Sequence, residues 1–241
     1  MGRLSAMLPK PLYRICRRCL NMLGVRTRIK GPRNRIRMQL AALRDVEIDI
    51  EGSDNEINIE AGCFLKTVSI RMRGTGHQLH IGRDTWAVDE NFHFEMQDCG
   101  IYIGQRVRMN GGKLSAAETG TSIFIGDDCG LAEGLDMRTT DSHAIVDLDT
   151  GAPLNRGADI RIGRNVWMGL QVLVMKGAVV GDHSVVGARS IVLREIPPRC
   201  LAVGAPARVI RENVSWVWDS PSSFARLSEA DLKMLRSGED A

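Results

Sequence analysis

Aromatic residues are scarce in this chain of 241 residues: they make up 5% of it, whereas hydrophobic residues as a whole make up 44%. The core must therefore be built mainly from Ile, Val, Leu, Met and Ala side chains. The sequence also lacks any apolar run approaching the ~20 residues of a membrane-spanning helix. Arginines interrupt the N-terminal region, where the apolar core of a signal peptide would lie. These absences favour a cytoplasmic protein, and the length of the chain is compatible with one domain or two small ones.

Cysteine is present but not concentrated. The six cysteines are spread along the chain, without the dense framework of a disulfide-stabilised fold. This pattern favours free thiols in a reducing compartment. Cys16 and Cys19 form a single CxxC motif with no second pair, so we interpret them as two residues of one short helix and not as a zinc site. Histidines are also few, and no three of them have a spacing suited to a metal, so no metal site is expected.

Positive charge is concentrated near the N-terminus, although the net charge is only +3. Residues 1–45 contain twelve Arg and Lys but a single acid, whereas the rest of the chain contains twenty basic and twenty-eight acidic residues. Within this basic arm, residues 11–23 place apolar side chains on one helical face and arginines on the other. Such a helix could make peripheral contact with the inner face of a membrane or cap an open stack of repeats. No nucleic-acid-binding motif is present.

A repeat of 22 residues runs through the first half of the sequence. The motifs LHIGRD, IYIGQR and IFIGDD place Ile81, Ile103 and Ile125 at this spacing, and INIEAG places Ile59 one step earlier. From Ile162 the period shortens to six, with apolar residues at 162, 168, 174, 180, 186 and 192. A period of six fits neither a helix nor a long strand. It predicts strands of about four residues joined by corners of about two, so that three sides make a triangular coil of about 18 residues.

Such coils stack with parallel pairing around a continuous aliphatic core, which predicts an all-β fold. The step from Ile125 to Ile162 is longer than one coil by about fifteen residues, and the excess falls in the polar, turn-rich stretch TTDSHAIVDLDTGAPLN at 139–155. A long irregular insertion in a compact repeat is usually functional. We therefore expect an excursion loop at 139–158 that carries chemistry around His143.

The stretch IGRNVWMGLQVLVMKGAVVGDHSVVGARSIVLREIPPRCLAVGAPARVIRE at 162–212 resembles the hexapeptide-repeat acyltransferases. RTTDSHAIVD at 138–147 resembles the catalytic segment of one branch, the galactoside, maltose, capsule and polysialic acid O-acetyltransferases. The good match covers about 80–216, and 45–80 match by rhythm alone. The resemblance implies a left-handed parallel β-helix that assembles as a homotrimer and holds acetyl-CoA between neighbouring helices.

We expect three segments: a basic N-terminal arm with a helix, the left-handed β-helix with its excursion loop, and a C-terminal tail. Their bounds are 1–44, 45–212 and 213–241. In the tail, SEADLKMLR at 228–236 predicts a short helix with Ser228 as its N-cap.

Acetyl transfer to a hydroxyl needs a general base, donors for the oxyanion and a cleft that holds the thioester. His143 is the natural base because imidazole exchanges protons near neutral pH, and Asp141 or a carbonyl could orient its ring. The resemblance places Trp167 at the active site, Asn110 at the acceptor hydroxyls and the Gly169 amide as a candidate oxyanion donor. The plainer interpretations are a wall residue for Trp167 and an Asn-Gly turn for Asn110. The other four histidines are interpreted as ordinary.

For acetyl-CoA, the resemblance places the backbone of small residues against the pantetheine amides, a short segment against adenine, and arginines near the phosphates. These residues are, in turn, Gly187, Ala188 and Ser190, then Ala205 and Pro206, then Arg194 and Arg208.

Together, the residues and the resemblance predict an acetyl-CoA-dependent O-acetyltransferase. Its acceptor would be a sugar hydroxyl of a bacterial surface polysaccharide or its precursor, attacking the thioester directly. One alternative is N-acetylation of a nucleotide-linked amino sugar, since an amine needs less help from a base. Another is a non-catalytic β-helical scaffold, which absence of acetyl-CoA binding would favour. The cytoplasm is the expected location, with the basic arm as a possible contact to the membrane's inner face.

Overall fold

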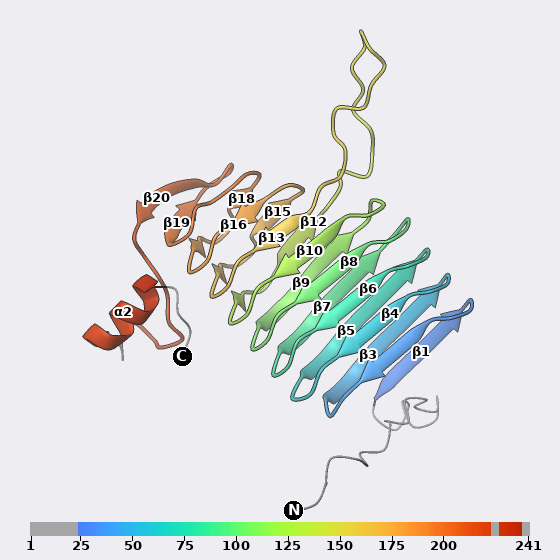
Figure 1. The fold of residues 1–241 in the computed structure, drawn as a ribbon, viewed down its shortest axis with the longest axis horizontal. Coiled ribbons are helices and arrows are strands. Elements are labelled where there is room, and N and C mark those ends of the chain that lie inside the picture. Colours follow the sequence, from blue (N-terminus) through green and yellow to red (C-terminus); the bar gives the residue numbers. More distant parts are fainter. Residues whose placement is uncertain (1–23, 223–226, 238–241) are drawn as a thin grey trace, which may run out of the picture.

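A computed structural model describes residues 24–222 and 227–237 of the chain. Its strands form a stack of coils that progresses along one axis (Figure 1). Among the described strands every ladder is parallel except one, in which β20 (Arg208–Glu212) returns antiparallel to β19 (Cys200–Val203). The predicted all-β fold of stacked parallel coils is confirmed.

Each coil has three sides, which we call faces 1, 2 and 3. In the longer coils one strand bends at a corner to form faces 1 and 2, and a shorter strand forms face 3. The bent strands are β3 (Ala42–Glu51), β5 (Phe64–Arg73), β7 (Trp86–Phe94) and β9 (Arg108–Ala116), and β1 (Val25–Lys30) adds to face 2. The face 3 strands are β2 (Arg35–Met38), β4 (Glu56–Ile59), β6 (Gln78–Ile81), β8 (Gly100–Ile103) and β10 (Ser122–Ile125).

In the later coils the corners are tighter and each face has its own short strand. Face 1 contains β11 (Gly130–Leu131), β14 (Trp167–Met168) and β17 (Val185–Val186). Face 2 contains β12 (Leu135–Arg138), β15 (Leu173–Met175) and β18 (Ile191–Val192). Face 3 contains β13 (Ile160–Ile162) and β16 (Val179–Val180). Trp167 pairs with Val185, whereas Phe64 pairs with Trp86, so both predicted coil lengths are confirmed.

The isoleucines of the repeat motif form one column of the core. Their side chains have at most 3% of their surface exposed, and they occupy equivalent positions in successive coils of face 3. Each inward side chain is therefore covered by its counterpart in the next coil, and burial of this aliphatic surface stabilises the stack. The members of the column are Ile59, Ile81, Ile103, Ile125 and Ile162.

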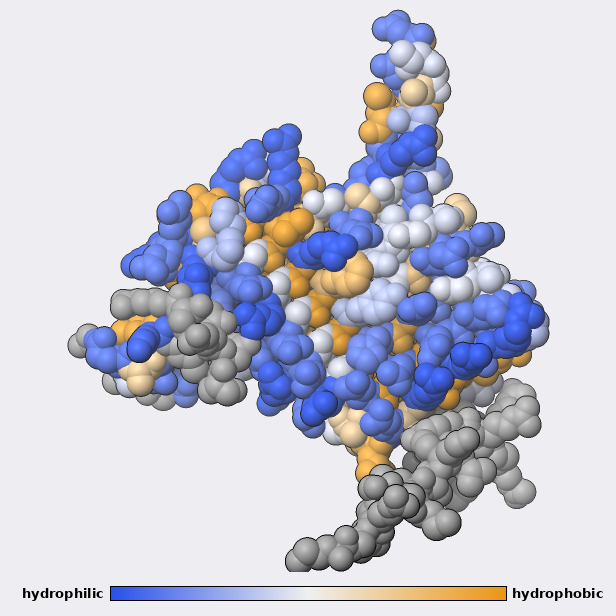
Figure 2. Space-filling model, in the orientation of Figure 1, coloured by the Kyte–Doolittle hydropathy of each residue, from blue (hydrophilic) through white to orange (hydrophobic). Residues whose placement is uncertain are grey.

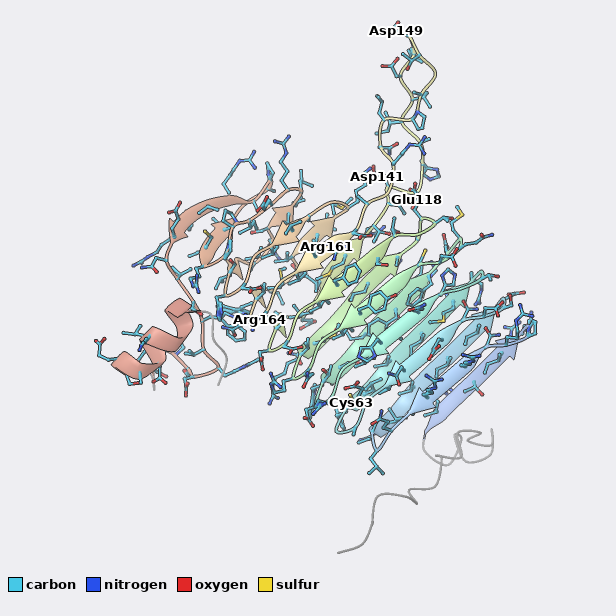
Figure 3. All side chains as sticks on the ribbon, viewed as in Figure 1. Cys63, Glu118, Asp141, Asp149, Arg161 and Arg164 are labelled. Carbon is cyan, nitrogen blue, oxygen red and sulfur yellow. The ribbon has the colours of Figure 1, made fainter. Side chains whose placement is uncertain are left out.

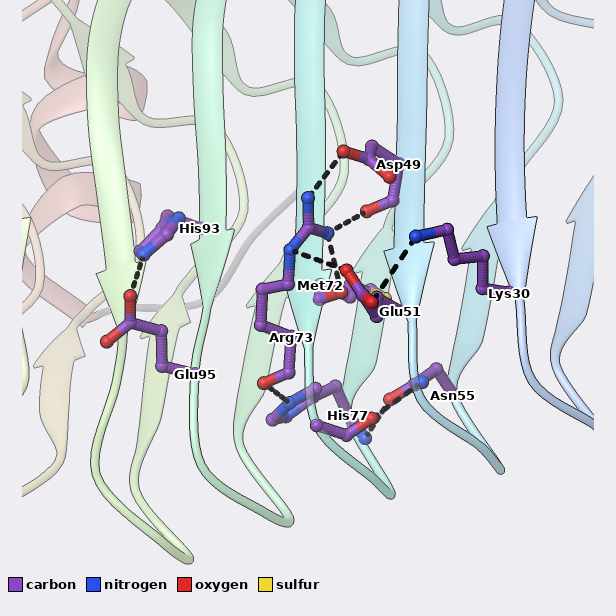
Figure 4. A network of polar contacts seen from close by, with 10 residues as sticks. Lys30, Asp49, Glu51, Asn55, Met72, Arg73, His77, His93 and Glu95 are labelled. Carbon is purple, nitrogen blue, oxygen red and sulfur yellow. Dashed lines mark hydrogen bonds and ion pairs between the residues drawn. The ribbon is translucent and has the colours of Figure 1, made fainter.

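Buried polar side chains complete the corners between faces 2 and 3. Asn55 Oδ1 accepts a hydrogen bond from the His77 amide at 2.9 Å (Figure 4). His77 Nδ1 accepts one from the Cys99 amide at 3.3 Å. Burial lowers the pKa of His77, which favours the neutral ring that this acceptor role requires. His77 thus has a structural role in the stack.

The coil begins earlier than the boundary expected at residue 45, because β1 and β2 lie before it. Basic side chains of this first coil face acidic side chains of the next, so part of the N-terminal positive charge is balanced within the fold. These partners are Lys30 and Glu51, Arg33 and Asp54, and Arg37 and Glu56. The helix expected at 11–23, with its CxxC motif, lies outside the described residues.

Between β12 and β13 the chain leaves the stack and projects away from it as an arm (Figure 1). Thr139 and Asp159, at the two ends of this segment, are hydrogen-bonded to the stack. The surface of this arm carries both hydrophilic and hydrophobic residues (Figure 2). Its exposed large aliphatic side chains are Ile145, Val146, Leu148 and Leu154.

The last described element is a helix, α2 (Glu229–Ser237), near the C-terminal coils (Figure 1). The Asp231 amide donates to Ser228 Oγ at 3.1 Å, which confirms Ser228 as the predicted N-cap. In the part of the chain described here, no helix combines the length and hydropathy that crossing a membrane requires.

Candidate functional site

A cavity of about 660 Å³ lies between face 1 and the C-terminal segment that follows β20. Face 1 contributes Arg108, Asn110, Ala132 and Trp167 to its lining. The opposite wall is largely apolar and includes Trp216, Trp218, Pro221, Leu227 and Leu232. The cavity therefore combines an apolar wall with a few polar groups, as small-molecule sites commonly do. Two residues predicted for the site, Asn110 and Trp167, are among those that line it.

Gly130 lets the C-terminal segment approach face 1. It lies in register between Arg108 and Trp167 in the stack. A Cβ atom at Gly130 would lie 2.8 Å from the Trp216 ring and 3.2 Å from the Trp218 ring, so a larger residue would displace both. The Trp216 indole donates to the Asn165 carbonyl at 2.7 Å, and its ring centroid is 6.0 Å from that of Trp167. This packing positions the wall opposite Trp167.

Three predicted residues share one row at the edge of face 1. The strand register places Asn110, Gly169 and Gly187 in equivalent positions of their coils. The Gly169 amide, however, donates to the Val186 carbonyl at 2.8 Å. It is therefore engaged inside the stack, and its expected role as an oxyanion donor is wrong for this conformation. Gly169 instead permits a close approach of coils, because a Cβ there would lie 2.6 Å from the Ala188 nitrogen.

The residues predicted to bind acetyl-CoA lie together in the last coils. Ser190 is buried and its hydroxyl accepts a hydrogen bond from the Gly204 amide at 3.0 Å, so its side chain is not free for a ligand. The Ala205–Pro206 bond is cis. The turn that contains it is tied to β18, because the Ala207 amide donates to the Ile191 carbonyl at 2.8 Å. Gly187, Ala188, Arg194 and Arg208 belong to the same end of the stack, beyond Trp167.

His143 lies on the projecting arm, and its backbone is anchored to the body. Asn155 Nδ2 donates to the His143 carbonyl at 2.9 Å and to the Asp141 carboxylate at 2.8 Å. Lys176, in the coil that follows, donates to the same carboxylate and to the Asn155 carbonyl. The Lys176 ammonium, and then the Asn155 amide, hold the pKa of Asp141 below its usual range. Figure 3 places Asp141 at the base of the arm and Asp149 at its tip.

Asp141 therefore does not orient the His143 ring as the sequence suggested. Among the residues that the structure describes, its hydrogen-bond partners are Lys176 and Asn155, and it fixes the backbone beside His143. A second contact supports the arm from the preceding coil, because Thr140 Oγ1 donates to Glu118 Oε2 at 3.0 Å. The sequence interpretation missed Lys176 and Asn155. They are 35 and 14 positions away from Asp141 in the sequence, and only the stacking of the coils brings them into contact with it.

His143 and Trp167 are not brought together within one chain. The arm leaves the stack at the corner between faces 2 and 3, and in a triangular coil this corner is opposite face 1, which carries Trp167. None of residues 139–158 lines the cavity beside Trp167. Within the described ranges, no group of three or more His, Cys, Asp or Glu side chains is arranged to hold a metal ion.

No protein-family model matches the chain. A polysialic acid O-acetyltransferase of Neisseria meningitidis is 32% identical over 130 residues, which are 52% of this chain and 58% of that protein. The chain thus spans little more than half the length of this curated relative. The solved structure of the polysialic-acid-specific acetyltransferase NeuO is similar with a TM-score of 0.78 and 24% identity, over 89% of this chain and 90% of NeuO. The solved structure of the polysialic acid O-acetyltransferase OatWY is similar with a TM-score of 0.72 and 26% identity, over 88% of this chain and 98% of OatWY.

These likenesses confirm the resemblance to the acetyltransferases that the sequence predicted. They also confirm the fold class, a left-handed parallel β-helix, since NeuO and OatWY match the stack over most of its length.

Proposed function

We propose that the protein is an acetyl-CoA-dependent O-acetyltransferase that modifies a sugar hydroxyl of a bacterial surface polysaccharide or its precursor. The observation that carries the proposal is the anchored arm. An exposed histidine has its backbone fixed by Asn155 and Lys176, in a chain similar to polysialic acid O-acetyltransferases. The names of these relatives make polysialic acid the first acceptor to test.

The proposed chemistry is direct transfer. His143 accepts the proton of the sugar hydroxyl as its oxygen attacks the thioester carbonyl carbon. When the carbon–sulfur bond breaks, the imidazolium returns the proton to the departing thiolate, which leaves as the free thiol of coenzyme A. The four described cysteines, Cys63, Cys99, Cys129 and Cys200, are buried thiols, which argues against a cysteine acyl-enzyme. Trp167 and the small residues of the last coils supply the surface along which acetyl-CoA would lie.

A homotrimer would complete this site, with the arm of one copy reaching face 1 of its neighbour. Two observations support this proposal: the arm leaves opposite the face that carries Trp167, and it exposes several aliphatic side chains. Exposed apolar groups clustered on a projecting segment are typical of an interaction surface. A cytoplasmic location and contact with a membrane through residues 1–44 stay predictions.

The activity can be tested with purified protein, acetyl-CoA and polysialic acid, by following release of the free thiol. His143→Ala should lower turnover by about 100-fold or more, the usual contribution of a general base. Binding of coenzyme A, measured by calorimetry, should be unchanged. His93→Ala is the matched control, because His93 lies on face 2 and pairs with Glu95. Near-normal turnover of His143→Ala would contradict the proposed base.

The shared site can be tested by mixing two inactive variants. If His143→Ala and Trp167→Ala are each nearly inactive, subunits co-expressed from both should recover part of the activity. Some neighbouring pairs would then combine an intact arm with an intact Trp167. A site contained in one chain would give no recovery, so an inactive mixture of correctly assembled subunits would overturn the proposed arrangement.

A further inference from the structure

Face 1 continues from the cavity toward the N-terminal coils as two rows of outward side chains. The first row contains Phe64, Trp86, Arg108, Gly130 and Trp167, in register from coil to coil. Neighbouring strands lie about 4.8 Å apart, so this row is about 19 Å long. Arg108, Gly130 and Trp167 line the cavity itself, so the row and the cavity together are longer than a single sugar ring.

The second row lies beside the first on the same strands. It contains Arg44, Lys66, Val88 and Asn110, each in register with the next. Asn110 also lines the cavity beside Trp167, so the second row ends in the candidate site. The two rows thus form one continuous surface over β3, β5, β7 and β9.

Aromatic side chains are exposed on this surface, although the chain has few of them. The ring centroids of Phe64 and Trp86 are 4.1 Å apart, and Trp86 is 41% exposed. The Arg108 guanidinium lies 5.3 Å from the ring centroid of Trp218, which joins the two rows to the wall of the cavity. A tryptophan offers an apolar surface and one N–H donor, a combination suited to a sugar ring with its hydroxyls.

The charge of this surface has one sign. The two rows contain Arg44, Lys66 and Arg108 but no acidic residue, whereas the chain after residue 45 is acidic on balance. Arg44 lies 3.9 Å from the carboxylate of the adjacent Asp45. On face 2, by contrast, basic and acidic side chains are mixed along the strands, and Arg73, for example, pairs with Asp49 (Figure 4). Within the part of the chain that the structure describes, Lys66 and Arg108 form no ion pair. Two basic groups are therefore available to an anionic ligand.

We infer that this surface, defined by Phe64, Lys66, Trp86 and Arg108, binds an extended anionic polysaccharide and leads it to the cavity beside Trp167. The inference rests on the proposed function and adds the surface that would hold the acceptor over several sugar units. The length of the surface suits a polymer, its basic side chains favour an anionic one, and its exposed aromatic groups suit sugar rings. Because the surface is continuous with the cavity, a polysaccharide bound on it would reach the proposed site of acetyl transfer.

The test measures binding without turnover. In the full-length His143→Ala protein, without acetyl-CoA, fluorescence anisotropy would follow labelled polysialic acid of long chain length and a labelled sialic acid dimer. We expect the long chain to bind at least tenfold more tightly, and added salt to weaken its binding. Trp86→Ala and Lys66→Gln should each weaken long-chain binding by about threefold to tenfold and leave dimer binding unchanged.

Phe124→Ala is the matched control, because Phe124 is an aromatic residue on face 3 that also lies beside an arginine, Arg161. It should leave binding of both probes unchanged. Trp86→Phe should retain most of the long-chain affinity, which separates loss of the ring from loss of the fold. Equal affinity of the His143→Ala protein for the two probes would overturn the inference, whatever the enzyme assay shows.

The oligomeric state must be measured alongside binding. If Trp86→Ala dissociates the protein into single chains while long-chain binding by folded protein persists, the surface is an interface between copies and the inference fails. If no acetyl transfer is found but binding depends on chain length and on Trp86, the surface is a polysaccharide-binding site and the proposed reaction fails alone. The two proposals therefore fail on different measurements.

Discussion

Lys176 and Asp141 join the projecting arm to the coil that follows it. The Lys176 ammonium donates to the Asp141 carboxylate and also to the Asn155 carbonyl, at 2.9 Å for the latter. The side chains of Lys176 and Asp141 are 19% and 31% exposed, so water screens this ion pair less than a fully exposed one. Asn155 in turn donates to the His143 carbonyl, so these contacts also restrain the backbone of His143. The arm thus begins and ends at one polar cluster, and the proposed base lies next to it.

Replacing Lys176 with Met should reduce turnover without removing coenzyme binding. The variant keeps most of the side-chain length but loses the ammonium group, which donates both hydrogen bonds. The backbone beside His143 is then held less firmly. We expect kcat to fall about tenfold or more, because small misplacements of a catalytic group are costly. The KM for acetyl-CoA should change less than twofold, as the predicted coenzyme residues lie in other coils.

A matched variant controls for the loss of one surface lysine. Lys113 lies on face 2, two coils before β15, so Lys113→Met removes the same charge away from the arm. Lys176→Arg should recover part of kcat because it restores a charged donor. If both Lys176 variants lower kcat and coenzyme affinity together, the residue supports the fold in general and not the position of His143.

Enlarging Gly130 should open the cavity beside Trp167. A Cβ at this position would contact the Trp216 and Trp218 rings closer than atoms normally approach, so Gly130→Val must displace the C-terminal segment. We expect a change in intrinsic tryptophan fluorescence, faster hydrogen exchange in residues 213–222, and weaker binding of the acceptor. Gly151→Val is the control, since nothing lies within 4 Å of a Cβ there. Unchanged exchange in 213–222 would contradict this account of the wall.

The repeat made the stack predictable from the sequence. Inward residues such as Ile81 and Ile103 occupy the same position in every coil, so the number of residues in a coil equals the spacing between them in the sequence. The beginning of the stack was placed too late because Arg26, Arg28 and Lys30 of β1 add to the basic N-terminal segment, although they alternate with Val25, Thr27 and Ile29 as in a strand. Positive charge in a terminal coil resembles an arm until its acidic partners in the next coil are known.

The site was predictable only in part, for a related reason. His143 stood out because it interrupts the repeat, and Trp167 because its surroundings resemble a known motif. Contacts between coils leave no such pattern in the sequence. Asp141 meets Lys176, and Trp216 packs on Gly130, only because of which segments lie next to each other in the fold. The scarcity of tryptophan was a usable sign for Trp216 and Trp218, since two of the four tryptophans lie in the C-terminal segment.

The aliphatic side chains of the arm should contribute to assembly. Leu148 is 94% exposed and Leu154 is 64% exposed in a single chain, and burying each against a neighbour would stabilise the assembly by about 1.5–3 kcal/mol. Leu148→Ser with Leu154→Ser should therefore shift the protein toward single chains in sedimentation velocity experiments at low concentration. Asp149→Ser, at the tip of the same arm, should leave assembly unchanged (Figure 3). An unaltered distribution for the leucine variant would show that the arm makes no such contact.

A buried carboxyl group beside Gly111 should make stability depend on pH. Glu90 is 2% exposed; its Oε1 accepts a hydrogen bond from the Gly111 amide at 2.9 Å, and Oε2 has no partner among the described residues. Burial raises the pKa of Glu90 from 4.5 to about 8.

The sign of this pH dependence follows from where the proton is held. Between the two pKa values the folded protein keeps a proton on Glu90 that the unfolded chain has lost, so stability falls as pH rises through this window. The loss is complete above the folded pKa and amounts to about 5 kcal/mol. Glu90→Gln, which cannot ionise, should match the wild type near pH 5 and exceed its Tm by roughly 10 °C near pH 9 in thermal melts. Asp89→Asn removes a neighbouring exposed charge that contributes least to the shifted pKa of Glu90, so it should alter the pH profile of the wild type only slightly. The same slope in Glu90→Gln would show that Glu90 is not its source.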